Sequence, residues 1–584
     1  MSRPADPERA GSAGSAAEAQ PADSDRPALA SAAGLAASRR QLRLTSRGVE
    51  LLTALGALLL SALVCGYRVS VAHTARYPGH ADPAFTYGVA ENIAAGRGPD
   101  IDYVWHFLAP GTPLHHYAFD YWLPLPSQLM ALVLRHRPGL PAALELNVAL
   151  IVLMCAGAYA LTRALTDAPW APAVSAAAAL VQPVVSAYAM QAESAIYLGA
   201  FALPAMAAAI YARRWTALWA VAGAFAGLAA MSRSEGLLLC VVLGAAALLW
   251  HEHSRTYLRA GLLLAGYLVV SAPYLLTNLS HFGSPMPPAA ASFPFISSYE
   301  DLFAPRVRRS PGALFEGGLG RFFEIRGHLI DLQLEAAFAA MAPIVSVLVL
   351  LLIGSMAARS LAARRDARQA ESSRPGRLRL DAALPVLRSD WLAPVGFLLV
   401  AFLLNTLVAP AVAEGGAIVK VMITGVPILL VLAVVGLSRL RLHPALTAIC
   451  CLALIGYPLT SVAHHSRATI GHNNGIGRAA AALAAPLTAE AACLGRPVVL
   501  MTRQPWEVNQ ATGVATVALP TGSLAEILEV AQRYGVTDIE NPAVRLDAAT
   551  VARALAADGP LARSAAFASR KIYRIRAATS DARC

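Results

Sequence analysis

The sequence predicts a polytopic α-helical membrane protein with about eleven transmembrane helices, followed by a small C-terminal α/β extracytoplasmic domain. Hydrophobic residues make up 57% of the 584 residues, and the mean hydropathy is +0.52. Both values lie outside the range of soluble globular domains. Apolar segments recur along most of the chain, and the composition changes from about His465 to short mixed segments.

The N-terminal segment has the composition of an unfolded tail. Residues 1–38 are rich in Ala, Ser, Pro, Gly and Asp, with almost no large apolar side chains. Such a segment cannot bury enough surface to fold, so residues 1–48 are expected to form a disordered cytoplasmic tail. The first apolar run, about 20 residues from Val49, begins too far along the chain for an ordinary signal peptide. It is expected to be an uncleaved signal anchor.

The expected membrane domain covers residues 49–464, with external loops at 73–142 and 278–335. Several of its apolar segments are shorter than the roughly 20 residues of a bilayer crossing. After the first run, they lie near 143–164, 169–188, 193–212, 215–231, 235–250, 259–277, 336–357, 391–411, 418–438 and 443–463.

The orientation follows from the positive-inside rule, by which joints rich in Lys and Arg lie in the cytoplasm. The Arg-bearing joints alternate along the chain, which places the N-terminus in the cytoplasm and both external loops and residues 465–584 outside the inner (plasma) membrane of a bacterium. These joints carry Arg39, Arg40, Arg43 and Arg47; Arg213 and Arg214; Arg255 and Arg259; Arg364, Arg365, Arg368, Arg374, Arg377 and Arg379; and Arg439 and Arg441.

The net charge does not indicate a nucleic-acid partner. The formal charge is +11, but its largest cluster is the joint at 359–388, which the topology assigns to the anionic cytoplasmic leaflet. Membrane lipids are therefore the expected partners of these charges.

The longest polar interval in the first half of the chain is 79–125, GHADPAFTYGVAENIAAGRGPDIDYVWHFLAPGTPLHHYAFDYWLPL. Acidic, histidine and aromatic residues crowd there, directly behind one apolar segment. Polar chemistry concentrated beside a membrane indicates a site. Its candidate residues are Asp82 and, for substrate binding, Glu91, His106, Asp120 and Trp122.

A short helix is expected at the start of this interval. Asp82 followed by Pro83 is typical of a helix start, with Asp as the N-cap and Pro in the first turn. Apolar residues recur at helical spacing until Gly96, which predicts the end. The expectation is an amphipathic helix along the membrane surface. Asp82 would then be either a cap alone or a functional carboxylate at the water interface.

Asp100 and Asp102 form an Asp-x-Asp pair that can hold a divalent cation. That use needs a surrounding nucleotide-binding α/β fold, so the pair is only a weak metal candidate. The histidines at 106, 115 and 116 lack the spacing of a zinc site, which favours solvated loop histidines. No cofactor is certain, although a divalent cation could assist.

Three later features also bear on chemistry. Arg233 and Glu235 in MSRSEGLLL lie at the outer end of two short spans, where charge is costly unless paired or hydrated; a salt bridge closing the turn is the alternative. The prolines of 277–288, TNLSHFGSPMPP, suit an extended lid or an ordinary connector. Lys420 begins a span in a chain whose only other Lys is Lys571, and it could simply snorkel.

ADPAFTYGVAENIAAGRG resembles the first external loop of the GT-C glycosyltransferases, which include protein O-mannosyltransferases, aminoarabinose transferases of lipid A and mycobacterial arabinofuranosyltransferases. Those enzymes carry an Asp-Asp-Ala-Tyr-like start and then an Ala-Arg-Asn-Leu-Ala-Glu-Gly-x-Gly run. Asp82 falls on the second Asp, whereas Ala81 replaces the first. The matching residues of the run are Ala90, Asn92, Ile93, Ala94, Gly96 and Gly98.

The resemblance extends to three further features. The Arg233 turn resembles an Arg-x-Glu-Gly turn, FGSPMPP resembles a Phe/Tyr-Gly-x-Pro-x-Pro element that opens a later external loop, and family members carry a basic residue near Lys420. The resemblance implies a GT-C-like fold and transfer of a sugar from a polyprenyl-phosphate-linked donor to a hydroxyl on an extracytoplasmic glycan, lipid or protein acceptor. Asp82 would be the general base, with Lys420 and Arg233 on the leaving phosphate.

Two other classes remain open. A non-catalytic lipid-sugar transporter or flippase would also have many spans and interfacial charges, although no relay of charges in mid-span is evident. An accessory scaffold that kept the fold and lost the chemistry is the second alternative, because Ala81 stands where the family has an acid.

Residues 465–584 are expected to form the extracytoplasmic α/β domain. PVVLM, TVAL, VTDIE and KIYRIR alternate or run apolar as short strands do, and helices are expected at 524–534 and about 548–557. Nucleotide-binding and nucleophile motifs are absent from this sequence, so independent catalysis is not expected. Arg503 and Trp506 form a candidate ligand loop, unless the domain only packs on the membrane part.

The charge pattern generates a topology prediction. A cysteine introduced near Ala511 should react with an impermeant thiol reagent in intact cells, and one near Ala370 should not, because only the first lies on the side opposite the Arg-bearing joints. Labelling at both positions, or the reverse pattern, would refute the orientation.

Overall fold

The computed structural model describes residues 46–371, 390–407, 417–567 and 570–576, apart from 110, 251–255, 297, 308, 311, 313, 314, 316 and 441. Nearly all of the expected tail lies outside these residues. The same is true of several charged-joint residues, namely Arg39, Arg40, Arg43, Arg255, Arg374, Arg377, Arg379 and Arg441. The described residues from Glu50 onward belong to one compact unit.

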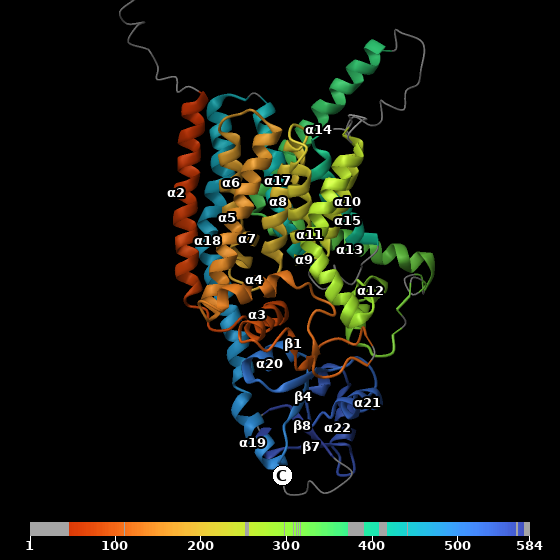
Figure 1. Ribbon diagram of the computed structural model, residues 1–584. Coiled ribbons are helices and arrows are strands. Elements are labelled where there is room, and N and C mark those ends of the chain that lie inside the picture. Colours follow the sequence, from red (N-terminus) through yellow and green to blue (C-terminus); the bar gives the residue numbers. More distant parts are fainter. Residues whose placement is uncertain are drawn as a thin grey trace, which may run out of the picture. The chain divides into compact units, whose positions relative to one another are not determined.

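A helix occupies each apolar segment that the sequence predicts (Figure 1). They are α2 (Ser46–Ala72), α5 (Leu140–Leu165), α6 (Ala171–Val181) with α7 (Pro183–Tyr188), α8 (Ala195–Tyr211), α9 (Leu218–Ser232), α10 (Glu235–Leu249), α11 (Thr256–Phe282), α13 (Gly318–Ala340) with α14 (Pro343–Glu371), α15 (Leu392–Leu407), α17 (Ala417–Arg439) and α18 (Pro444–Ala481).

The expected count of about eleven spans is not confirmed. Among the described helices, α2, α5, α11, α17 and the helix from Pro444 are long and apolar enough to cross a membrane. A sixth span results if α13 and the start of α14, which are bent by 109°, are one broken span. The other apolar helices are shorter. For example, α6 ends at Val181, and Pro183 breaks the ladder before α7 because it has no N–H to donate.

Two glycines set a close approach between α9 and α11. A Cβ atom on Gly223 would lie 2.0 Å from the Leu263 carbonyl oxygen, and one on Gly266 would lie 2.0 Å from that of Ala220. Apolar helices in lipid gain little from hydrophobic burial against each other, so small residues that let backbones approach are a main source of their packing energy. The pair therefore fixes α9, and with it the turn that carries Arg233.

The helix at the start of the polar interval begins earlier than predicted. α3 spans Ala81–Ala94, and its N-cap is His80, whose side chain makes no capping hydrogen bond. Asp82 therefore lies inside the first turn, and its prediction as the N-cap is wrong. Gly96 has φ +76° and follows the helix end, as predicted.

The prediction that this helix is amphipathic is also wrong, because α3 is buried around most of its circumference. Its position along the membrane surface stays a prediction. Phe85 and Val89 on the predicted apolar face are buried, but so are Tyr87 and Ala90. The reason is tertiary: α4 (Leu125–Leu134) and α20 (Pro505–Thr512) both pack against it. Single-sequence periodicity cannot show a helix covered from two directions.

The second external loop contains short helices directly after the proline-rich segment 277–288, for which the sequence left an extended lid and an ordinary connector open. α12 (Pro288–Ser292) begins on a proline, which suits the first helical position. The 3₁₀ turns η1 (Phe293–Phe295) and η2 (Tyr299–Phe303) follow. Gly283, at φ +66°, supplies the predicted bend after α11.

The C-terminal part contains a six-stranded sheet with order β2-β5-β4-β6-β8-β7. From β2 to β6 the neighbours are parallel, and β8 and β7 add antiparallel pairs. The strands are β2 (Tyr103–Val104), β4 (Val499–Thr502), β5 (Ala515–Ala518), β6 (Asp538–Glu540), β7 (Leu561–Arg563) and β8 (Ile572–Ile575).

The predicted helix at 524–534 is confirmed as α21 (Leu524–Tyr534), which starts with a capping box between Ser523 and Glu526. α19 (Ala484–Leu494) and α22 (Ala548–Ala554) complete the helices of this part. α18 runs through position 465, so the proposed start of a separate domain there stays a prediction. β2 comes from the first external loop and joins the sheet beside β5, which the sequence did not predict.

The glycine contact between α9 and α11 generates a stability prediction. Gly266→Ala should lower the melting temperature in detergent, because the new methyl group forces the two helices apart, at a cost of about 1–3 kcal/mol. Gly261 on the same helix is the matched control, since nothing lies within 4 Å of its Cβ position. Gly261→Ala should leave the melting temperature unchanged or raise it slightly. Equal behaviour of the two variants would contradict the packing argument.

Candidate active site

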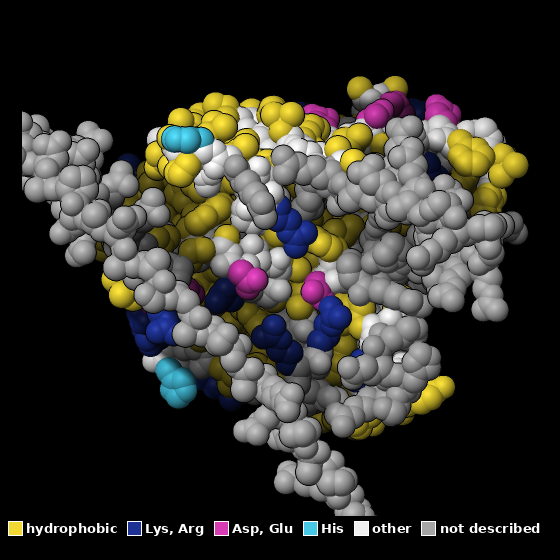
Figure 2. Space-filling model, turned by 90° about the horizontal axis from the view of Figure 1, so that it is seen from above, with side chains coloured by type: hydrophobic (Ala, Val, Ile, Leu, Met, Phe, Trp, Pro, Cys, Tyr) yellow, Lys and Arg dark blue, Asp and Glu magenta, His cyan; other side chains and the backbone are white. Residues whose placement is uncertain are grey.

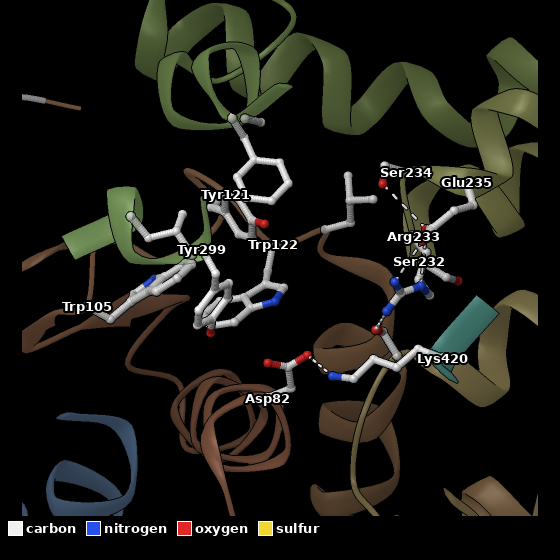
Figure 3. Close-up of a pocket in the computed structure, with 15 residues that line it drawn as sticks. Asp82, Trp105, Tyr121, Trp122, Ser232, Arg233, Ser234, Glu235, Tyr299 and Lys420 are labelled. Carbon is white, nitrogen blue, oxygen red and sulfur yellow. Dashed lines mark hydrogen bonds and ion pairs between the residues drawn. The ribbon is translucent and has the colours of Figure 1, made fainter. Parts of the chain in front are cut away.

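Several helix ends meet around a cavity of about 180 Å³ (Figure 3). Asp82 comes from the first turn of α3, and Lys420 from the first turn of α17. Arg233 follows the end of α9, and Ser194 immediately precedes α8. Tyr299 in the second external loop lines the opposite side of the cavity.

These positions lie at one end of their helices, and arginines occupy the other end. Arg213 follows the end of α8, Arg214 precedes the start of α9, and Arg439 ends α17. α17 has 23 residues, and so it is about 34 Å long at 1.5 Å per residue. Figure 2 views the end at which α2 begins and shows Lys and Arg side chains in the middle of that face.

The ionic side of the cavity is built around Lys420. Its ammonium contacts the carboxylate of Asp82 and lies 2.9 Å from Oε2 of Glu193. The Lys420 side chain is only 12% exposed, and that of Glu193 is fully buried. Lys420 is therefore held between two carboxylates and does not snorkel into solvent. Removing a charge from such a group leaves the others buried and unpaired.

Asp82 is ionised at neutral pH in this setting. Burial is the largest single influence and raises the pKa of Asp82, but the charges of Lys420, His80 and Arg233 together lower it below its usual value. An ionised carboxylate with one oxygen paired to an ammonium retains lone pairs that can accept a proton.

Arg233 and Glu235 form a two-pronged ion pair. Arg233 Nη2 lies 2.8 Å from Glu235 Oε1, and Nε lies 3.1 Å from Oε2. Arg233 also donates to the Ser194 hydroxyl at 3.4 Å. The salt bridge that closes the turn therefore exists, and both of its residues also line the cavity. The two predicted alternatives for this turn are not exclusive.

Aromatic side chains form the facing wall of the cavity (Figure 3). The rings of Trp105 and Trp122 are stacked, with centroids 4.2 Å apart. Tyr121 meets Trp105 edge to face, and Trp506 of α20 lies 5.4 Å from Trp105. An aromatic wall offers a large apolar surface at low cost in side-chain entropy. The cavity thus has one charged side and one aromatic side.

The predicted residues divide between this cavity and two other places. Asp82, Lys420, Arg233 and Trp122 line it together. Glu91 lies farther along α3 and lines a separate hollow of about 270 Å³.

His106 and Asp120 form a buried pair, with His106 Nε2 3.3 Å from Asp120 Oδ2. The Leu108 N–H donates to His106 Nδ1 at 3.3 Å. His116 Nε2 is 4.0 Å from the same oxygen, and burial lowers the pKa of His116. His115 is largely exposed, so the expectation of a solvated loop histidine is confirmed for this residue. The same expectation is wrong for His106 and His116, which are buried or nearly so.

Asp100 begins β1 (Asp100–Ile101), which pairs with β3 (His116–Tyr117). Asp102 is 63% exposed and pairs with His115 at 2.6 Å. In the part of the chain that the structure describes, no group of three or more His, Cys, Asp or Glu is arranged to hold a metal ion. The metal prediction for these two aspartates therefore gains no support.

Sequence reasoning missed Glu193 as the second carboxylate on Lys420. The available signal was a lone acid at the first position of the predicted span 193–212, where an unpaired charge is costly. It also missed Trp105 and Tyr121, which lie in the polar interval among other aromatics. Tyr299 carries no signal in the sequence, because only the folding of the second external loop brings it to the cavity.

One site is therefore built from the first external loop, the helix ends and the second external loop. No protein-family model matches the sequence, and neither does any curated protein. The Archaeoglobus fulgidus oligosaccharyltransferase in its apo form is similar in structure with a TM-score of 0.55 and 13% identity, covering 86% of this chain and 70% of that one. The same enzyme tethered to an acceptor peptide containing an NVT sequon gives 0.55 and 13%, covering 83% and 69%.

ArnT from Cupriavidus metallidurans, in a structure with undecaprenyl phosphate, gives a TM-score of 0.53 and 14% identity, covering 89% of this chain and 98% of that one. Oligosaccharyltransferase and ArnT are both GT-C membrane glycosyltransferases. At these identities the similarity concerns the fold, and the chain has the GT-C fold that its first external loop predicted.

Proposed function

We propose that this protein is a membrane glycosyltransferase that moves a sugar from a polyprenyl-phosphate-linked donor to a hydroxyl of an extracytoplasmic acceptor, in the glycosylation of cell-envelope glycan, lipid or protein. The observation that carries the proposal is the cavity in which Asp82, paired with a Lys420 that also contacts Glu193, faces an aromatic wall. The paired carboxylate suits a hydroxyl nucleophile, which must lose a proton. The two cations suit a charged leaving group, and the apolar wall suits a sugar ring.

In this mechanism Asp82 is the general base. The acceptor hydroxyl is a weak nucleophile until its proton has somewhere to go, and a positioned carboxylate can take it. The acceptor oxygen then bonds to the anomeric carbon while the bond from that carbon to the phosphate oxygen breaks. A single displacement of this kind inverts the anomeric configuration.

Lys420 links the two ends of this displacement. Its ammonium is shared between Asp82 and Glu193 before reaction. When Asp82 accepts the proton it loses its charge, which weakens its attraction for Lys420. The leaving phosphate gains negative charge in the same step, so the ammonium becomes available where charge develops. Arg233, at the same cavity, can assist.

The aromatic side of the cavity is suited to the sugar and the start of the lipid. Trp105, Trp122 and Tyr299 present apolar ring surface, which a sugar can meet with its C–H groups while its hydroxyls face the charged side. Of the two similar proteins, ArnT has a structure with undecaprenyl phosphate and the oligosaccharyltransferase one with an acceptor peptide. A polyprenyl donor follows by analogy, and a peptide is one of the acceptors to test.

The expected orientation supports an extracytoplasmic site. The cavity lies at the helix ends opposite Arg213, Arg214 and Arg439, and the positive-inside rule puts these arginines in the cytoplasm. The cavity, the second external loop and the C-terminal sheet then lie outside, where lipid-linked sugars serve as donors.

A deletion strain gives the test of function. Lipid extracts of cells lacking this protein should accumulate a polyprenyl-phosphate sugar that mass spectrometry can identify, and the wild-type gene should clear it. Asp82→Asn keeps the side-chain volume and removes the basicity, so transfer should fall by roughly 10²-fold or more and the lipid should persist.

Asp558→Asn, an exposed aspartate of the C-terminal part, is the matched control and should clear the lipid. Normal clearance by Asp82→Asn would contradict the assignment of the base. A deletion strain with an unchanged lipid profile would favour the transporter or scaffold alternatives.

Substitutions of Lys420 test its role on the leaving phosphate. Lys420→Met preserves much of the apolar stem and deletes the charge, so we expect weaker donor binding and little turnover. Lys420→Arg should restore part of the activity because it keeps the charge, although its geometry differs.

A double variant separates this role from stability. Lys420→Met alone leaves two buried carboxylates unpaired, which should lower the melting temperature. Adding Glu193→Gln removes one of these charges, so the double variant should regain stability and stay inactive. Donor binding and turnover like those of the parent in Lys420→Met would show that Lys420 has no part in the reaction.

A further inference from the structure

The helix α20 brings a second carboxyl group to the start of α3. α20 packs against α3 and carries Trp506, which reaches the aromatic wall, followed by Glu507. Glu507 is 5% exposed. A carboxyl group this deeply buried is rare unless it is satisfied by specific partners.

Glu507 occupies the place of a helix cap that α3 lacks. The N-cap residue His80 makes no side-chain capping bond, whereas the backbone of Ala81, the first residue of α3, hydrogen-bonds to the Glu507 carboxylate. A negative charge at a helix N-terminus is stabilised by the free N–H groups there. The second oxygen, Oε2, has no hydrogen-bond partner among the described residues. Position 507 thus supplies a carboxyl group beside Ala81, whose own side chain has none.

Few titratable side chains among the described residues lie near Glu507. From α3 it faces Asp82, and from β2 it faces the buried Tyr103. The other elements that pack on α20 are α18 and β5. Within the described residues, no titratable side chain of either one acts appreciably on Glu507. Among the described residues, Asp82 is therefore the charged side chain that acts on Glu507. Because the interaction of two charges is mutual, the charge of Glu507 acts on Asp82 in turn.

We propose that Glu507 is a positioning residue for Asp82: it holds the first turn of α3 through Ala81, and its negative charge makes the neighbouring Asp82 carboxylate a stronger base. This inference rests on the proposed function. It assigns a catalytic consequence to the C-terminal part of the chain, which otherwise contributes only Trp506 to the aromatic wall.

The inference has a defined pH dependence. Burial raises the pKa of Glu507 to about 7, a rise that the hydrogen bonds from its own backbone and Ala81 limit and the charge of Asp82 increases. Below this pH Glu507 is neutral, and above it Glu507 is ionised. An ionised neighbour disfavours the charged form of Asp82 and so raises its affinity for a proton. The transfer rate should therefore rise with pH through a step near pH 7.

The experiment is a pH–rate profile of full-length enzyme in detergent or membranes, with the polyprenyl-phosphate sugar isolated from the deletion strain. Wild type should show the step in kcat/KM near pH 7. Glu507→Gln, which can still accept from the Ala81 N–H, should lose the step and keep the low-pH rate throughout. Glu507→Asp should retain a step. Glu529→Gln, an exposed glutamate on α21, is the matched control and should behave as wild type.

Thermal unfolding gives a readout that needs no activity. A carboxyl group whose pKa is higher in the folded state than in the unfolded state stabilises the fold most when protonated, and this contribution is lost as pH rises toward the folded-state pKa. The wild-type melting temperature should therefore fall between pH 5 and pH 8, and this fall should be smaller in Glu507→Gln.

The two hypotheses fail separately. The role of Glu507 is refuted, and the proposed function stands, if Asp82→Asn is inactive while Glu507→Gln keeps the wild-type step. The same conclusion follows if wild type and Glu507→Gln show the same dependence of melting temperature on pH. If Asp82→Asn transfers sugar normally, the general base is elsewhere, and the role of Glu507 falls with it. Should Glu507→Gln fail to fold, Glu507→Asp decides: a profile without any step would overturn the inference.

Discussion

The buried ammonium of Lys420 between two carboxylates is the contact on which the site depends. Charges removed from water must be paired, or the cost is several kcal/mol for each. Asp82 belongs to α3, Glu193 precedes α8 and Lys420 begins α17. The need to pair these charges therefore holds three segments, far apart in the sequence, at one point. Apolar packing alone does not impose this arrangement. The pairing fixes the ends of these helices, while the helices themselves pack by shape.

The same interaction decides how the cavity can respond to chemistry. Asp82, Glu193 and Glu235 carry three negative charges, and Lys420 and Arg233 carry two positive ones. A proton taken up by Asp82 makes this group of five neutral. In the proposed mechanism, the protonation of Asp82 weakens the hold of the carboxylates on Lys420 and Arg233. These cations can then interact more strongly with a phosphate that gains charge in the same step.

The sequence predicted the positions of the apolar helices and named four of the residues that line the cavity, but it did not predict the contacts between them. Helical periodicity gave α21 its correct bounds, and the GT-C-like loop indicated Asp82. The start of α3 was misplaced by two residues, because the helix N-terminus is satisfied by Glu507 from a distant segment and not by a local cap. The pairing of Glu193 with Lys420 was missed because the two residues are distant in the chain, and pairing across such a distance leaves no periodic signal. His106 and Asp120 were both named as candidates, but their contact depends on the conformation of the loop between them, which has no periodic pattern.

The first external loop is shared between the two parts of the chain, and this explains why a C-terminal segment can matter to a site at the helix ends. β2 adds Tyr103 and Val104 to the C-terminal sheet beside β5, and the next residue, Trp105, belongs to the aromatic wall. α20 returns from that sheet to pack on α3. The loop is therefore held at two points, by β2 in the sheet and by α3 against α20. Because the sheet and α20 hold Trp105 and the first turn of α3 to the same part of the chain, the C-terminal part helps to set the distance between the aromatic wall and Asp82.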